Sequence, residues 1–131
     1  MVLVLLKGGS MQVNNVNSQN FTGVKYQYHN VTNAWFNYKL KQGGKSAVAK
    51  MAKIMEAQKD NPYHIVLNYT GDNKSVKEYT TVNGKEFVKG KFEPIINLIK
   101  RSAKYANNLK RNAVEPPIEL AGLEDFIIDE L

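Results

Sequence analysis

The sequence predicts an α+β domain with an antiparallel sheet, and three patterns carry this prediction. Residues 24–41 alternate between apolar and polar side chains, which is typical of strands. Residues 46–59 and 93–113 repeat apolar side chains at helical spacing. Asn83-Gly84 separates two strand-like runs and is a preferred pair for a two-residue hairpin turn. The expected order is hairpin, helix, three strands, helix and acidic C-terminal tail, with both helices packed on one face of the sheet.

Length and composition indicate one globular domain. The chain has 131 residues, of which 43% are hydrophobic and 23% charged, and it contains no cysteine. The absence of cysteine excludes a disulfide framework and any thiolate chemistry. The apolar run at residues 1–6 is too short to span a membrane, so we expect a cytoplasmic protein without a membrane partner. We expect residues 1–20 to be an extension or first strand, 21–114 a basic domain and 115–131 an acidic, partly hydrophobic tail.

The expected hairpin has a defined register. A three-residue loop at 31–33 gives it one apolar face, formed by Val24, Tyr26, Tyr28, Phe36, Tyr38 and Leu40. The opposite face then presents Lys25, Trp35 and Lys39, where an exposed aromatic ring among lysines could stack a nucleobase. The alternative is that Trp35 packs beneath another segment, as tryptophan commonly does.

The two expected helices have recognisable ends and faces. Ser46 is a candidate N-cap for the first, and Glu93 and Pro94 suit the first turn of the second. The second helix carries a regular apolar stripe, formed by Ile95, Ile99, Ser102, Ala106 and Leu109.

Charge is divided sharply along the chain. Residues 1–114 contain all 18 Lys and Arg but only half of the 12 acidic residues, and residues 115–131 contain the other half and no base. On the second helix, the side opposite the apolar stripe carries Lys100, Arg101, Lys104 and Arg111. Phosphates could offset the repulsion between these cations, whereas a purely solvated helix more often intersperses acids among its bases. This surface is therefore the main candidate for a nucleic acid or another anionic partner.

The order helix, three strands, helix from Ser46 to Ala113 resembles that of double-stranded-RNA-binding domains. Pro62-Tyr63 before the first strand, Gly71 in the first turn and the "KRSAK" run of the last helix are similar to features of that family. The lysine cluster lies deeper inside the helix than in that family, so no site residue is transferred. The resemblance implies RNA as a partner.

No catalytic constellation is visible in the sequence. Gly44-Lys45-Ser46 lacks the glycine that a phosphate-binding loop needs five positions earlier, where Lys39 stands. His29 and His64 are each isolated in sequence from acids that could orient them. We therefore expect neither a metal nor a cofactor, and no enzymatic activity.

The acidic tail contains apolar residues that purely solvating tails lack. Leu123, Phe126, Ile127 and Leu131 are the candidates for docking a second protein or for folding back onto the basic helix. The sequence thus favours a non-catalytic nucleic-acid-binding domain, for RNA before single-stranded DNA, with an autoinhibitory or partner-docking tail. The alternative is a small protein–protein interaction module, such as an inhibitor or assembly factor, that binds no nucleic acid.

Overall fold

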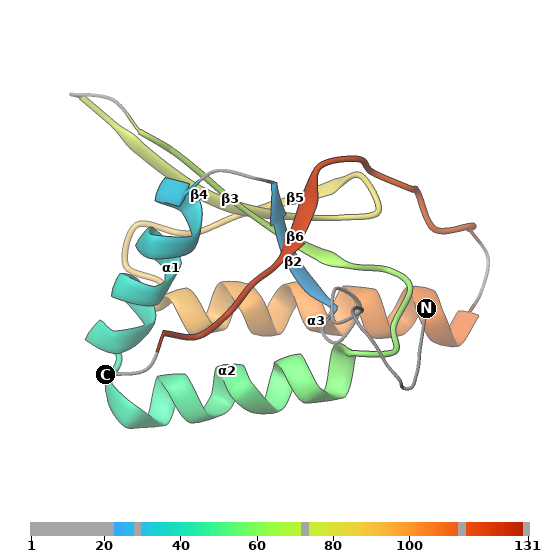
Figure 1. Ribbon diagram of the computed structural model, residues 1–131, viewed down its shortest axis with the longest axis horizontal. Helices are drawn as coiled ribbons and strands as arrows, with labels where there is room; N and C mark the ends of the chain where they lie inside the picture. Colours follow the sequence, from blue (N-terminus) through green and yellow to red (C-terminus); the bar gives the residue numbers. More distant parts are fainter. Residues whose placement is uncertain (1–22, 28–29, 72–73, 113–114, 130–131) are drawn as a thin grey trace, which may run out of the picture.

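The protein is an α+β fold in which a five-stranded mixed sheet lies against a layer of helices (Figure 1). The computed structural model describes residues 23–27, 30–71, 74–112 and 115–129. Within these residues the elements are β2 (Val24–Gln27), α1 (Asn30–Gln42), α2 (Gly44–Gln58), β3 (Ile65–Gly71), β4 (Val76–Val82), β5 (Lys85–Val88), α3 (Ile95–Asn112) and β6 (Leu123–Asp125). Residues 1–20, expected to form an extension or first strand, lie outside the described residues.

The sheet is mixed, which corrects the expectation of a purely antiparallel one. Its strand order is β5-β4-β3-β2-β6, and β2 runs parallel to β3 while the other neighbours are antiparallel. The parallel pair arises because α1 and α2 together connect β2 to β3, and a parallel neighbour needs such a crossover. Strands β3, β4 and β5 form the expected consecutive antiparallel group.

One face of the sheet holds the core. Paired residues share a face, so the register of β2, β3 and β4 puts Val24, Tyr26, Ile65, Leu67, Thr80 and Val82 together, and all six are buried. Helix α3 packs on this face, where Ser102 hydrogen-bonds Thr80. Helix α1 packs on it too, because Trp35 stacks on Tyr69 of the same face. Helix α2 packs against α1 and α3 instead of along the strands, so only the second of the two predicted helices packs directly on the sheet as expected.

The expected second strand of the N-terminal hairpin is wrong, because residues 30–42 form α1. Phe36 and Leu40 satisfy a period of two, but with Thr32 they also satisfy a helical spacing of four. The helix buries these three side chains and leaves Tyr38 55% exposed, although a strand would have buried Tyr38 beside them. The local sequence thus fits both a strand and a helix, and tertiary packing stabilises the helix.

Other local predictions are confirmed. Asn83 and Gly84 have φ angles of 51° and 89°, the positive values that the two-residue turn between β4 and β5 requires. The apolar stripe of α3 is buried throughout, from Ile95 to Leu109.

The expected N-cap of α2 is wrong, since that helix begins at Gly44 with Gly43 as its N-cap, and Ser46 lies inside it.

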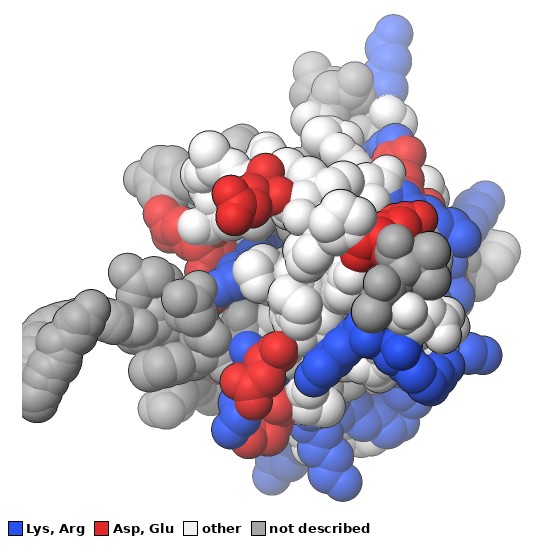
Figure 2. All heavy atoms as spheres, turned by 90° about the vertical axis from the view of Figure 1, so that its right-hand side faces the viewer, with Lys and Arg blue, Asp and Glu red and all other residues white. Residues whose placement is uncertain are grey.

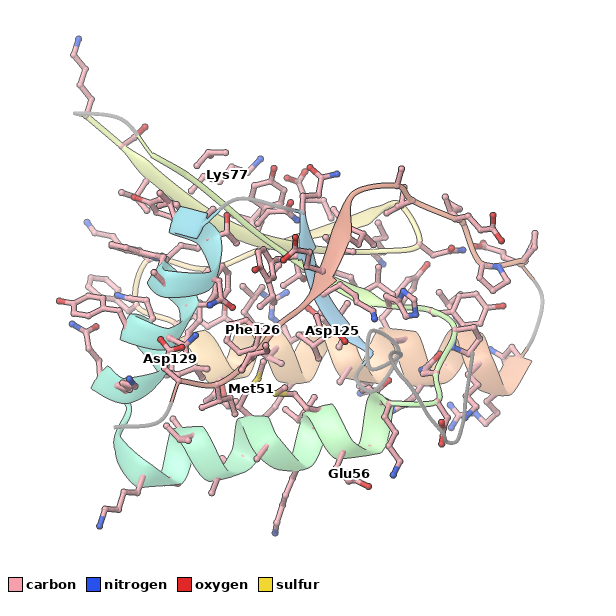
Figure 3. The ribbon with its side chains drawn as sticks, viewed as in Figure 1. Met51, Glu56, Lys77, Asp125, Phe126 and Asp129 are labelled. Carbon is pink, nitrogen blue, oxygen red and sulfur yellow. The ribbon has the colours of Figure 1, made fainter. Side chains whose placement is uncertain are left out.

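The C-terminal segment belongs to the fold. Strand β6 pairs with β2, and the next residue, Phe126, is completely buried in the core. Asn37 of α1 holds the segment beyond, because its side-chain amide donates to the Ile127 carbonyl at 2.9 Å and accepts from the Asp129 N–H at 2.8 Å. Figure 3 shows Phe126 pointing into the space between sheet and helices, toward Met51 of α2. Residues 123–129 are therefore not a free tail.

Candidate nucleic-acid interface

A shallow groove between α2 and α3 collects three of the predicted cations. This α2–α3 groove has a volume of about 380 Å³ and is lined by Ile54, Lys100, Ala103, Lys104, Asn107, Asn108 and Arg111. Lys100, Lys104 and Arg111 are exposed. Among the described residues that line the groove, none is acidic. The apolar stripe of α3 fixes this arrangement, because burying it turns the opposite, basic side outward.

Figure 2 looks onto the end of the molecule where α2 and α3 finish. On this side Lys and Arg dominate the lower right, whereas most acidic side chains lie above and to the left. On this face, basic and acidic side chains are thus partly separated. A ligand that approaches the helices meets mainly positive charge.

Arg101 is engaged within the fold. Its guanidinium makes two hydrogen bonds of 2.9 Å to the Glu93 carboxylate and donates to the Val88 carbonyl at 3.0 Å. This contact with Arg101 is the main cause that lowers the pKa of Glu93 below its usual range, and the Gly90 N–H acts in the same direction. Arg101 therefore secures the loop before α3 and neutralises Glu93, and it is the least available of the four predicted helix cations.

A second cavity lies where α2 and α3 begin, and we call it the lysine pocket. It has a volume of about 500 Å³, and its charged lining is Lys39, Lys50, Lys89, Lys91 and Glu93. Ser46 and Gln42 add polar groups, and Phe92 stands at the same site with 89% of its surface exposed. Because the pocket meets the first turns of two helices, their partial positive charge adds to that of the lysines.

The lysine pocket and the α2–α3 groove lie one helical turn apart along α2 and α3. On α2, Lys50 lines the pocket and Ile54 the groove, and on α3 the same holds for Ile96 and Lys100. Residues four apart occupy the same helix face, so the two cavities follow each other along one seam.

The predicted hairpin residues do not form a joint site. Lys25 is buried, with only 5% of its side chain exposed, and forms an ion pair with Asp125 of β6. Trp35 stacks on Tyr69 at 4.6 Å and donates to Glu78 at 2.7 Å. Lys39 joins the lysine pocket, although its ammonium also lies 5.8 Å from the Trp35 ring centre. Because α1 replaces the expected strand, the three side chains that would share one face are separated.

A third cavity lies beside the ion pair of Lys25 and Asp125. It has a volume of about 560 Å³, and its lining includes Lys25, His64, Ile118, Leu120 and Leu123. Burial lowers the pKa of His64, and the nearby charge of Lys25 lowers it further, while Asp125 opposes this effect. The imidazole is thereby kept neutral over a wider pH range. The cavity is lined by His64 and by the carboxylate of Glu119, whereas Asp125, which pairs with Lys25, is not part of the lining.

The four predicted docking residues have different environments. Leu123 is half-buried in β6, Phe126 lies in the core and Ile127 is 65% exposed, whereas Leu131 lies outside the described residues. Phe126 is thus not available as a docking side chain while the core is intact.

Sequence reasoning missed the residues that complete the lysine pocket. Lys50, Lys89, Lys91 and Phe92 come from two distant segments, and only the fold brings them together. The run "KGKFEP" at residues 89–94 was an available signal, because aromatic side chains among basic residues are a combination that binds single strands.

Comparison with known proteins adds no identity: no family model, curated protein or solved structure matches the chain. The resemblance to double-stranded-RNA-binding domains therefore rests on the order of α2, β3, β4, β5 and α3. In the described part of the chain, no helix is long and apolar enough to cross a membrane, and no cluster of three metal-binding side chains occurs.

Proposed function

We propose that this protein is a non-catalytic nucleic-acid-binding domain that holds RNA, or less favourably single-stranded DNA, on its helical layer. One observation carries the proposal: Lys100, Lys104 and Arg111 are exposed along one groove whose described lining contains no acid. Phosphate groups are the ligands that such a row fits, because each neutralised phosphate releases condensed counterions.

The energetic argument concerns Lys100 and Lys104. They lie four residues apart on α3, where like charges repel and weaken the helix slightly. Neither shows a salt bridge within the described residues. A polyanion bound in the groove offsets this repulsion between the two lysines. Without a bound anion, the repulsion remains.

We do not propose that the C-terminal segment acts as a tethered competitor for the basic groove. β6 and Phe126 are held by the sheet and the core, so displacing them costs folding energy that a free acidic tail would not lose. The charges of this segment are partly used inside the fold, as the ion pair of Lys25 with Asp125 shows.

The test is the salt dependence of binding by the full chain to a labelled 12-nucleotide single-stranded RNA. For single strands, log affinity falls with log salt by roughly 0.7 per neutralised phosphate. Lys100→Ala combined with Lys104→Ala should weaken binding to all sequences alike and should reduce this slope by roughly 1.4.

The matched control removes two lysines from the sheet side, by combining Lys74→Ala with Lys77→Ala. Lys77 lies on β4 away from α2 (Figure 3), where it forms an ion pair with Glu86, and the control variant removes the same two positive charges as the groove variant. If both double variants reduce affinity by the same factor, binding reflects net charge and not the groove. If the unmodified protein binds no RNA or DNA at low salt, the proposal fails and the protein-interaction alternative gains, with exposed Ile118, Leu120 and Ile127 as its contact residues.

A further inference from the structure

Phe92 is the most exposed of the large apolar side chains that the structure describes. Its relative exposure is 89%, whereas the next, Ile127, reaches 65%. It precedes α3, and the ammonium of Lys91 lies 5.5 Å from its ring centre. An aromatic ring left almost entirely in water loses the stabilisation that burial would give, so packing does not account for its position.

The side chains around Phe92 are suited to phosphate. Lys39, Lys50 and Lys91 line the lysine pocket, and no salt bridge engages them within the described residues. Lys89 is partly engaged, because it lies 3.7 Å from Glu78. The acidic member of the lining, Glu93, is already neutralised by Arg101. An anion entering the pocket therefore meets cations whose charge is not balanced locally.

We propose that the lysine pocket is a nucleotide subsite for a single strand, in which an unpaired base stacks on Phe92 and the lysines hold its flanking phosphates. This inference rests on the proposed function and specifies its ligand. An aromatic platform among lysines binds single strands because every unpaired base offers a flat π face, whereas a base in a duplex is already stacked on its neighbours.

The seam between α2 and α3 provides the remainder of the track. The α3 residues that line pocket and groove run from Ile95 to Arg111, which is about 24 Å along a helix. This length holds roughly seven stacked nucleotides at ~3.4 Å per step. One strand can thus place a base on Phe92 and its later phosphates beside Lys100 and Lys104.

The experiment compares Phe92→Leu with the unmodified full chain. Leu keeps an apolar side chain but removes the ring, and the high exposure of Phe92 makes loss of folding an unexpected outcome, which thermal unfolding checks. The probes are a 12-nucleotide single-stranded RNA and a 12-base-pair RNA duplex at the same salt. Affinity for the single strand should fall by roughly tenfold, whereas affinity for the duplex should stay within about twofold.

Tyr38→Leu is the matched control, since Tyr38 is an aromatic residue 55% exposed on α1 and outside the lining of the pocket. It should leave both affinities unchanged. As a second readout, the indole added by Phe92→Trp should be quenched when the single strand binds, beyond any quenching seen in the unmodified protein.

The outcomes separate this inference from the proposed function. If Phe92→Leu binds single strands as tightly as the unmodified protein while the Lys100/Lys104 variant does not, the groove binds nucleic acid and the stacking subsite is refuted. Equal losses for single strand and duplex also refute it, because the bases inside a duplex are already stacked on their neighbours. If the unmodified protein binds neither probe, the proposed function and the subsite both fail.

Discussion

Asn37 shows how one polar side chain can fix a segment distant in sequence. The residue is 2% exposed on α1, and its amide satisfies the Asn33 carbonyl as well as the backbone of Ile127 and Asp129. Asn37→Ala removes these partners from half-buried groups, so the free energy of unfolding should fall by about 2 kcal/mol. Urea denaturation measures this loss. Asn97→Ala, an exposed change on α3, should stay within about 0.5 kcal/mol, and equal effects would show that Asn37 does not hold the segment.

His64 makes stability depend on pH in a defined direction. Its pKa in the folded protein lies below its ordinary value of 6.5, chiefly because the ring is half-buried. Below that value the unfolded chain takes up a proton before the folded protein does, so stability falls as pH decreases, until folded His64 is also protonated. Urea denaturation from about pH 7.5 to about pH 5.5 should show this loss, before most carboxylates titrate. In the His64→Gln variant, this loss of stability at low pH should be smaller. An unchanged dependence of stability on pH would assign the loss to other titratable groups.

At the scale of elements, β6 and Phe126 join the end of the chain to the core. Phe126 is completely buried, and its backbone N–H donates to the Val24 carbonyl at 2.9 Å. Phe126→Ala should lower the free energy of unfolding by about 3–5 kcal/mol, through lost burial and the cavity that remains. Chemical denaturation checks this, with Ile127→Ala as an exposed neighbour that should cost less than about 0.5 kcal/mol. A mild effect of Phe126→Ala would mean that the segment is detachable and would restore a tail-like role.

α1 illustrates why the element types could not all be read locally. The residues of β2 alternate as predicted, but Lys25 is buried on the face away from the core, where Asp125 pairs with it from nearly the other end of the chain. The sequence pattern of α1 fits a strand as well as a helix. The stacking of Trp35 on Tyr69 is a contact that α1 makes with the sheet as a helix. α3, by contrast, was predictable, because 18 residues with a regular apolar stripe leave little ambiguity.

At the scale of the whole molecule, the division of charge has two origins. Part of it is internal, since Asp125 pairs with Lys25 and Glu124 accepts from Tyr26 across the β2–β6 pair. The rest is external, because the lysine pocket and the α2–α3 groove gather cations from three helices and the loop before α3. The proposed ligand would meet only this external part.

The candidate site was predictable only where one helix carries it. Lys100, Lys104 and Arg111 follow from the position of the buried stripe on α3, since the opposite side must face water. The lysine pocket could not be derived in this way, because Lys39, Lys50 and Phe92 meet only after α1, α2 and the loop before α3 have packed.

The sequence by itself determined the α+β class, the hairpin at Asn83-Gly84 and the buried face of α3, because short-range periodicity and turn geometry decide these features. The tertiary structure decided that residues 30–42 are helical, that β2 is parallel to β3 and that β6 closes the sheet. These choices depend on contacts between residues far apart in the chain, such as Asn37 with Asp129 and Trp35 with Glu78. Such contacts stabilise one of several patterns that are acceptable locally. The local sequence alone does not show which distant residue will provide the contact.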